Sequence, residues 1–327
     1  MVSLVTGATG FIGANIVRAL IDTGEAVRVL VRRSSDRRNI DGLPVEIVYG
    51  DLRHAASLRA ALRGCHTLYH AAAHYSLWTP KVSEVYAINV EGTTHLLRAA
   101  LALGVQKVVY TSSVATLGLP TDGSPGNETM TLPLAKAVGH YKRSKILAEQ
   151  RVLALCSQGL PVVVVHPSAP IGPWDMKPTP TGKILVDFLR RKMPAYLDTG
   201  LNLIDVRDVA QGHILAAQRG TIGERYILGC RNMSLRTILQ LLADVSGLPA
   251  PRWRIPYGVA LIAGYVSEGM AYVTGKPPTV PLVGVRLARQ PMYFTAHKAV
   301  RELGLPQSCI AEALRQAVQW FRQRGYA

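Results

Sequence analysis

Ser113, Tyr141 and Lys145 have the residue types and spacing needed to move a proton to or from a substrate oxygen. Tyr141 and Lys145 are four residues apart, so a helix would place both on one face. Tyrosine has an unperturbed pKa of ~10 and is a poor base at neutral pH, but a nearby ammonium group favours its phenolate. We therefore expect Ser113 to hydrogen-bond the substrate oxygen while Tyr141 transfers the proton.

A glycine-rich loop near the start of the chain predicts the ligand that works with these residues. Gly7, Gly10 and Gly13 follow an apolar run at residues 2–5 and open an apolar segment at 11–23. In a strand–loop–helix unit, Gly7 would allow the tight turn, Gly10 the close approach of a pyrophosphate, and Gly13 close packing of helix on strand. The free N–H groups of the helix would then face the anion, so a dinucleotide is expected. A surface Tyr/Lys pair is common by itself, but its combination with this loop is not.

Arg32 indicates which dinucleotide is preferred. A site for NAD usually offers an acidic residue to the ribose about 20 residues beyond the glycines. Here the second apolar run ends in Arg32-Arg33, and the first acid is Asp36. An arginine can pair with a 2′-phosphate, so NADP(H) is favoured over NAD(H), with Arg32 as the expected contact. The alternative is a solvated basic loop.

Alternating apolar runs and helix-like segments predict the elements that position these residues. The pattern is typical of an α/β protein with a doubly wound parallel Rossmann sheet. Asp51 and the run His70-Ala71-Ala72-Ala73 would follow strands at the edge where such sheets bind ligands, although an N-cap and tight packing would also explain them. The expected strands are 2–5, 26–31, 45–49, 67–70, 107–111 and 162–166, and the expected helices are 11–23, 55–62, 82–103 and 140–157.

The sequence pattern changes at Pro167. From there on prolines are frequent, and apolar runs no longer alternate with helix-like segments. We expect residues 1–166 to form the NADP-binding domain, with 203–222 returning to it. Residues 167–327 would form a smaller, mostly helical substrate-binding domain. Its expected elements are helices at 182–191, 206–218, 234–246 and 309–324 and a short strand at 225–228.

Composition limits the partners and the compartment. The net charge of +16 favours phosphorylated ligands or an anionic membrane surface, and no motif for nucleic-acid binding stands out, so no nucleic acid is expected. The apolar stretch 259–273 is short for a membrane span and contains Glu268, so an interfacial helix at the inner face of the membrane is the alternative to a purely cytoplasmic protein. A homodimer remains open. The four scattered cysteines predict neither a disulfide framework nor a metal site.

The motifs together resemble the extended short-chain dehydrogenases/reductases. The chain has T-G-x-x-G-x-x-G at 6–13 and Y-x-x-x-K at 141–145, and the resemblance covers essentially its whole length. Segments 111–118, 139–145, 178–182 and 194–202 are similar to the bacterial hopanoid-associated sugar epimerase family, which is itself similar to dihydroflavonol 4-reductase.

The resemblance implies roles for individual residues. Ser113, Tyr141 and Lys145 would form a catalytic triad in which Lys145 binds the nicotinamide ribose and lowers the pKa of Tyr141. Asn89 would support the active-site helix. Asp51 would lie near the adenine, Ala72 and Ala73 along the cofactor, and Pro167 and Ser168 beside the nicotinamide. The full set of expected cofactor-binding residues is Gly7, Thr9, Gly10, Phe11, Ile12, Gly13, Arg32, Asp51, Leu52, Ala72, Ala73, Asn89, Pro167 and Ser168.

Three functions fit these residues. Segment 165–173 resembles the reductase form of this region more than the nucleotide-sugar form. With Arg32, this favours an NADP(H)-dependent reductase that acts on a small carbonyl or sugar-like substrate, including a lipid-linked one such as a hopanoid side chain. The alternatives are an NAD(P)-dependent nucleotide-sugar epimerase or dehydratase and a non-catalytic NADP-binding sensor.

Overall fold

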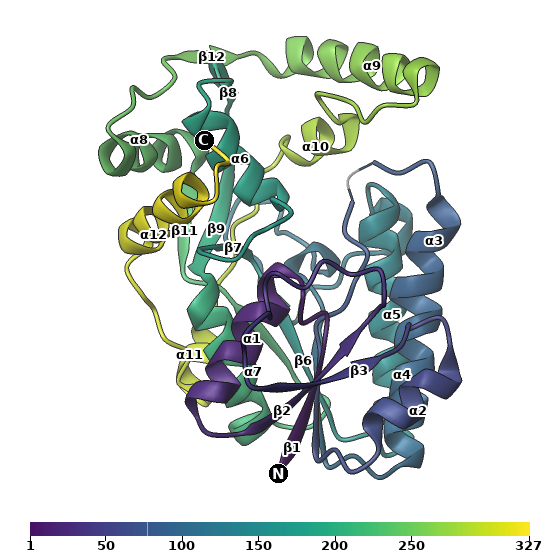
Figure 1. Ribbon diagram of the computed structural model, residues 1–327. Coiled ribbons are helices and arrows are strands. Elements are labelled where there is room, and N and C mark those ends of the chain that lie inside the picture. Colours follow the sequence, from purple (N-terminus) through teal and green to yellow (C-terminus); the bar gives the residue numbers. More distant parts are fainter. Residues whose placement is uncertain (77) are drawn as a thin grey trace.

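A seven-stranded parallel sheet forms the centre of the computed structural model, which describes residues 1–76 and 78–327 (Figure 1). The strands are β1 (Val2–Thr6), β2 (Ala26–Val31), β3 (Val45–Tyr49), β4 (Thr67–His70), β5 (Lys107–Thr111), β6 (Val162–Pro167) and β10 (Arg225–Leu228). Their order across the sheet is β10-β6-β5-β4-β1-β2-β3. The predicted doubly wound Rossmann sheet is confirmed.

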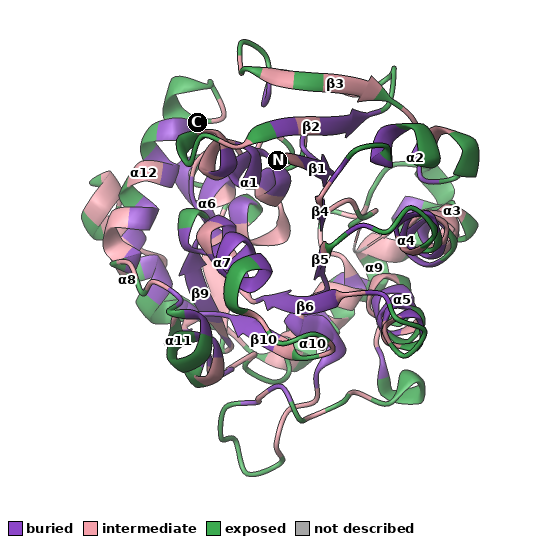
Figure 2. Ribbon diagram, turned by 90° about the horizontal axis from the view of Figure 1, so that it is seen from below, coloured by how far each residue is buried: buried purple, intermediate pink, exposed green. Residues whose placement is uncertain are grey.

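Helices cover both faces of this sheet. α1 (Phe11–Asp22) and α7 (Val206–Arg219) pack together on one face, and α2 (Ala55–Leu62), α4 (Thr93–Ala102) and α5 (His140–Cys156) cover the other (Figure 2). The strands are rich in β-branched residues; β6, for example, is buried along its whole length. Strands buried on both faces in this way bring their carboxyl ends, and the loops that follow them, to one edge.

The expected helix at 82–103 is confirmed as one continuous helical segment that ends at Ala102, but it is not α-helical throughout. It consists of α3 (Val82–Tyr86), a π-helical turn (Ala87–Gly92) and α4 in direct succession. Gly92 lies so close to the preceding loop that a Cβ atom there would come within 2.7 Å of the Leu52 Cβ atom. Single π turns inside helices are often found at functional sites.

The C-terminal part adds two small sheets and a group of helices. One sheet has the order β11-β9-β7, formed by β11 (Arg231–Ser234), β9 (Gly200–Asp205) and β7 (Ala169–Ile171), and the other pairs β12 (Trp253–Ile255) with β8 (Ala195–Leu197). Three helices pack together beside them, α6 (Pro180–Leu189), α8 (Leu235–Ser246) and α12 (Ile310–Gln323). α9 (Tyr257–Thr274) and α10 (Leu282–Leu287) form a separate pair, and α11 (His297–Leu303) packs on α7 and β10.

Two parts of the second half of the chain contact the central sheet. α7 packs on α1 and against β5 and β6, and β10 pairs with β6 as the edge strand. The return to the sheet therefore extends past residue 222, because β10 runs from Arg225 to Leu228. The assignment of cofactor and substrate to the two parts stays a prediction. No helix among residues 1–76 and 78–327 is long and apolar enough to cross a membrane.

Candidate active site

The glycine loop between β1 and α1 has the geometry of a phosphate cradle. Gly7 has a φ of +74°, and the Gly10 N–H donates to the Gly7 carbonyl at 2.9 Å. A Cβ atom on Gly13 would lie 2.1 Å from the Gly7 oxygen, so no side chain fits there. α1 begins at Phe11 with no side-chain cap and no acidic residue in its first turn. Its free N–H groups and partial positive charge are therefore available to an anion such as a pyrophosphate.

Arg32 differs from the other arginines of its loop. Arg33 lies over the Tyr49 ring at 5.1 Å, Arg37 donates to the Tyr49 hydroxyl, and Arg38 pairs with Asp36. The exposed Arg32 side chain has no hydrogen bond or ion pair with another residue in the described part of the chain. Arg32 is thus the arginine of this loop whose side chain makes no such contact with described residues, and its expected contact with a 2′-phosphate stays a prediction.

Asp51 lies on the same edge, after β3. Its carboxylate accepts hydrogen bonds from the Arg53 guanidinium at 2.6 Å and the Arg53 N–H at 2.9 Å. The Arg53 contact, with a smaller effect of Arg32, holds its pKa at about 2. The adjoining Leu52 is buried against Gly92. Asp51 is thus a fixed anion close to Arg32.

The alanines after β4 line the other side of the glycine loop. A Cβ atom on Gly7 would meet the Ala72 nitrogen at 2.6 Å, so the backbones of the two loops are in contact, and Ala73 comes next. His70 holds this junction, with Nδ1 2.7 Å from the Thr6 hydroxyl and Nε2 2.9 Å from the Thr93 hydroxyl. Burial lowers its pKa to about 3, so His70 is a neutral structural residue.

Asn89, in the π-helical turn, connects the β4 loop to helix α5. Its amide donates to the Ser144 hydroxyl at 2.9 Å and the His74 carbonyl at 3.0 Å, and its oxygen accepts from the His74 N–H at 2.7 Å. Ser144 is next to Lys145. The sequence placed Asn89 as a support of the active-site helix, and these contacts fit that role.

Ser113 lies just after the end of β5, and Tyr141 lies in the first turn of α5. The two side chains are close to each other. The pKa of Tyr141 is raised to about 12 by burial, with a hydrogen bond from Ser113 acting in the opposite direction. The ring of Tyr75 lies 4.3 Å from that of Tyr141, centroid to centroid. At neutral pH the Tyr141 phenol is protonated, so it can donate a proton to a substrate oxygen.

Lys145 has partners that the sequence did not indicate. Its ammonium donates to the Tyr110 hydroxyl at 2.9 Å and the Thr111 carbonyl at 2.7 Å, and it lies 4.5 Å from the centre of the Tyr110 ring. Burial lowers its pKa to about 7, opposed by the Glu149 carboxylate. The ammonium is therefore held against β5, and the expected lowering of the Tyr141 pKa by Lys145 stays a prediction.

Glu149 is a site residue that the sequence analysis missed. One of its oxygens accepts hydrogen bonds from Ser112 at 2.5 Å, Thr116 at 2.9 Å and His166 at 3.0 Å, and the other pairs with Arg225 at 2.9 Å. Burial raises its pKa, but His166, Ser112 and Arg225 outweigh that effect and hold it at about 2. Its position four residues after Lys145, on the same helix face, was the available signal.

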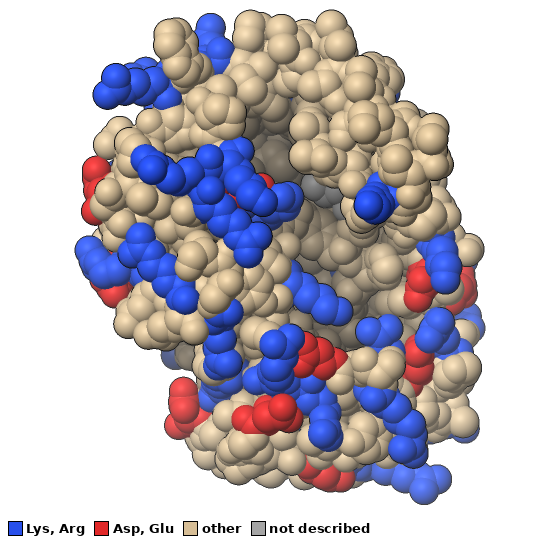
Figure 3. Space-filling view, turned by 45° about the horizontal axis from the view of Figure 1, so that its top comes forward, with Lys and Arg blue, Asp and Glu red and all other residues tan. Residues whose placement is uncertain are grey.

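Pro167 and Ser168 follow β6 beside this network. The Ser168 N–H donates to the Leu228 carbonyl at 3.0 Å, so β10 fixes the backbone. Its hydroxyl is buried and has no hydrogen-bond partner among residues 1–76 and 78–327. An unpartnered buried hydroxyl at the carboxyl edge of the sheet suits a polar group of a ligand. On the outside, the surface is hollowed between the two parts, and lysine and arginine side chains border the hollow (Figure 3).

The sheet order, the glycine cradle and the Ser113–Tyr141 pair define a Rossmann-fold protein of the dinucleotide-binding class. Residues 3–229 match the model of the NAD dependent epimerase/dehydratase family, and the chain belongs to that family. It is thus an NAD(P)-dependent oxidoreductase or epimerase of the extended short-chain dehydrogenase/reductase type.

Relatives with known names are similar over almost the whole chain. A dihydroflavonol 4-reductase-like protein of Synechocystis is 51% identical over 98% of this chain and 95% of its own length. Sterol demethylase protein B of Methylococcus capsulatus is 37% identical, with 99% of both chains covered. A 4-hydroxy-2-methyl-3-oxo-4-farnesyl-3,4-dihydroquinoline-1-oxide ketoreductase of Stigmatella aurantiaca is 34% identical over 97% of this chain and 96% of its own. Among solved structures, a nucleoside-diphosphate-sugar epimerase from Pseudomonas aeruginosa matches with a TM-score of 0.82 at 25% identity, covering 100% and 99% of the two chains.

Proposed function

We propose that this protein is an NADP(H)-dependent reductase that transfers a hydride to a carbonyl group, with Tyr141 as the proton donor. The protonated Tyr141 hydroxyl, paired with Ser113 at the carboxyl edge of the sheet, carries this proposal. An acid in that position suits reduction, in which the carbonyl oxygen gains a proton as its carbon gains the hydride. The reverse reaction, oxidation of a secondary alcohol, uses the same groups.

In this proposal, some residues bind the cofactor and others act on the substrate oxygen. The bound nicotinamide dinucleotide supplies the hydride. The glycine loop and the start of α1 hold its phosphates, Arg32 its 2′-phosphate, and Asp51 and Leu52 its adenine side. Ser113 donates a hydrogen bond to the substrate oxygen, and Tyr141 transfers its proton to it. Ala72, Ala73, Asn89, Lys145, Pro167 and Ser168 complete the cofactor site on the nicotinamide side.

The substrate we propose is an apolar polycyclic or isoprenoid carbonyl compound, such as a hopanoid with a sugar-like side chain. The names of two relatives support this class, since one refers to sterols and the other to a farnesyl quinoline oxide. The substrate would enter between the sheet and residues 167–327. A nucleotide-sugar epimerase is the second candidate, supported by the family description and the Pseudomonas structure.

One experiment separates these functions. The purified protein is mixed with NADPH and either a polycyclic ketone or a nucleotide sugar, and both NADPH absorbance and product are followed. Steady NADPH consumption with the ketone is the expected result. Redox-neutral isomerisation of the nucleotide sugar, without net NADPH consumption, would instead establish the epimerase.

Replacement of Arg32 tests the cofactor preference. In Arg32→Ser, we expect the Kd for NADPH to rise on the order of 10- to 100-fold while the Kd for NADH stays unchanged, because a charge-assisted hydrogen bond contributes about 1.5–3 kcal/mol. Both values are measured by fluorescence titration. Arg59→Ser, which removes an exposed arginine on α2, is the control. Equal weakening of both cofactors would show that Arg32 does not read the 2′-phosphate.

A further inference from the structure

Helix α9 presents its large apolar side chains outward and its small ones inward. The buried residues of this helix are Ala260, Gly264 and Ala271. Ile262, Met270 and Val273 are 67%, 61% and 88% exposed. Seven of the fifteen exposed large apolar residues in the described chain lie on α9: Val259, Ile262, Tyr265, Val266, Met270, Tyr272 and Val273. Helices on the surface of a globular protein normally turn such residues toward the core, so this face requires an apolar partner.

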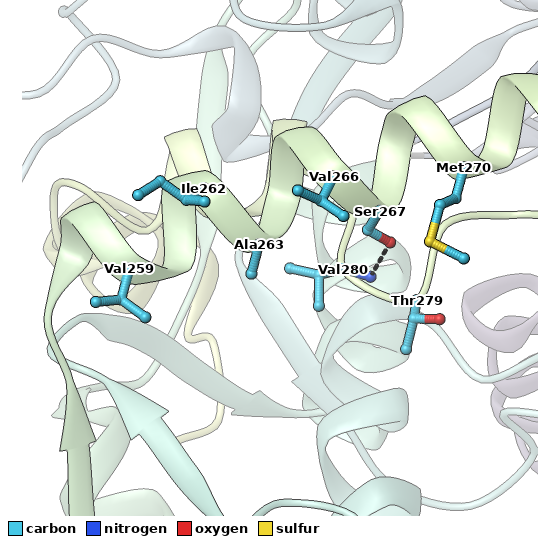
Figure 4. Close-up of a pocket in the computed structure, with 8 residues that line it drawn as sticks. All are labelled: Val259, Ile262, Ala263, Val266, Ser267, Met270, Thr279 and Val280. Carbon is cyan, nitrogen blue, oxygen red and sulfur yellow. Dashed lines mark hydrogen bonds between the residues drawn. The ribbon is translucent and has the colours of Figure 1, made fainter.

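The same helix forms one wall of an open apolar groove. The groove has a volume of about 500 Å³, and its other wall is the segment that leads into α10, with Thr279 and Val280 (Figure 4). Val266 and Val280 lie on its two walls, and the Val280 N–H donates to the Ser267 hydroxyl at 3.1 Å. Almost all of the lining is apolar: Val259, Ile262, Ala263, Val266, Ser267, Met270, Thr279 and Val280. A groove of this kind suits hydrocarbon chains.

The chain segment that contains α9 and α10 is basic. Residues 252–289 contain Arg252, Arg254, Lys276, Arg286 and Arg289 but only one acid, Glu268, although Asp198, just after β8, pairs with Arg254. The surface over α9, at the upper right of Figure 3, is itself almost without charge. A symmetric contact between two copies of this face would bring the same cations toward each other. An anionic lipid surface complements both the apolar face and its basic border, and the net charge of +16 adds to the attraction.

We propose that the outward face of α9, with the basic residues around it, docks this protein on an anionic lipid bilayer. The pair of helices also touches the active-site region: α10 packs on α9, and its Val283 side chain would lie 3.0 Å from a Cβ atom on Gly139, two residues before Tyr141. Docking through α9 thus places the start of helix α5 near the lipid phase. This proposal concerns a partner surface and goes beyond the proposed reaction.

Vesicle flotation tests the proposal without turnover, so its result is independent of the substrate. The full-length protein is floated with vesicles of phosphatidylcholine mixed with phosphatidylglycerol, and with phosphatidylcholine alone. We expect binding to the anionic vesicles at low salt and weaker binding as salt is raised. The triple variant Ile262→Ser, Val266→Ser, Met270→Ser should bind at least roughly tenfold more weakly, because three apolar side chains no longer enter the bilayer.

Two control variants keep the result specific to α9. Ile222→Ser removes an apolar residue that is 53% exposed elsewhere, and Arg59→Glu reverses a charge on α2; both should float like the wild type. Lys276→Glu should weaken binding. Absence of wild-type binding to anionic vesicles, or equal binding by the folded triple variant, would overturn the proposal. A wild-type dimer that the triple variant abolishes, without vesicle binding, would assign the face to self-association instead.

Discussion

Replacement of Tyr141 by phenylalanine is expected to lower kcat on the order of 10²- to 10⁴-fold. The variant keeps the ring and its contact with Tyr75 but loses the hydroxyl that lies close to Ser113. Because the proposed proton donor is removed while the ring stays in place, the loss should appear in kcat at saturating substrate. Steady-state kinetics of NADPH consumption with a carbonyl substrate measures it.

Cofactor binding provides the internal comparison for Tyr141→Phe. The Kd for NADPH should change little, since the proposed phosphate contacts are in the glycine loop and at Arg32, away from Tyr141. Tyr272→Phe, on the exposed part of α9, removes a phenol hydroxyl away from the site and should leave kcat unchanged. If NADPH binds tightly to the wild type and no substrate is turned over by either protein, the sensor function is the correct one.

Replacement of Glu149 by alanine is expected to lower the free energy of unfolding by about 3–5 kcal/mol. The variant leaves the buried His166 and the half-buried Arg225 guanidinium without their carboxylate, and it removes the acceptor for the Ser112 hydroxyl. Urea unfolding followed by circular dichroism measures the change. Glu46→Ala is the matched control: its ion pair with Arg28 at 2.8 Å is 54% exposed on the Glu46 side, and its loss should cost at most about 1 kcal/mol.

The difference in free energy of unfolding between the wild type and Glu149→Ala should depend on pH, because of the pKa of Glu149. Its ordinary pKa of 4.5 is lowered to about 2 in the folded protein. The folded state therefore binds the proton less well than the unfolded state, and the stabilisation by the carboxylate is fully present above pH 4.5 and is lost as the pH falls toward 2. The difference in free energy of unfolding between the wild type and Glu149→Ala should therefore become smaller as the pH falls from 4.5 toward 2. A Glu149→Ala effect no larger than that of Glu46→Ala would show that the network does not stabilise the fold.

The sequence was sufficient to predict all seven strands of the central sheet as segments and the glycine loop, although 225–228 was expected in the second domain and not as the edge strand of this sheet. Most of these strands are short runs rich in β-branched residues between turn signals. Gly7 and Gly13 could be recognised from the sequence, because a loop of this type brings backbone atoms so close at both positions that only glycine fits. Ser113 and Tyr141 could be proposed as partners because of their residue types and because Tyr141 lies four residues before Lys145, a spacing that puts both on one helix face.

Features that depend on contacts between distant segments could not be predicted. Glu149 pairs with Arg225, which belongs to the edge strand β10 in the second half of the chain. Lys145 is bound by the Tyr110 hydroxyl, and nothing in the local sequence indicates that this tyrosine points at the helix. The strands β7, β8 and β12 have three residues each, too few for a period to be visible.

The π-helical turn Ala87–Gly92 takes in one more residue than an α-helical turn, because its hydrogen bonds run from i to i+5. The wider turn absorbs that residue locally, so α3 and α4 keep nearly the orientation they would have in a regular helix. Asn89 lies in this turn and contacts both the His74 backbone and the Ser144 hydroxyl. Deletion of one residue from the turn is therefore expected to leave Leu96 and Leu97 packed in the core while it moves the Asn89 amide away from at least one of its two partners.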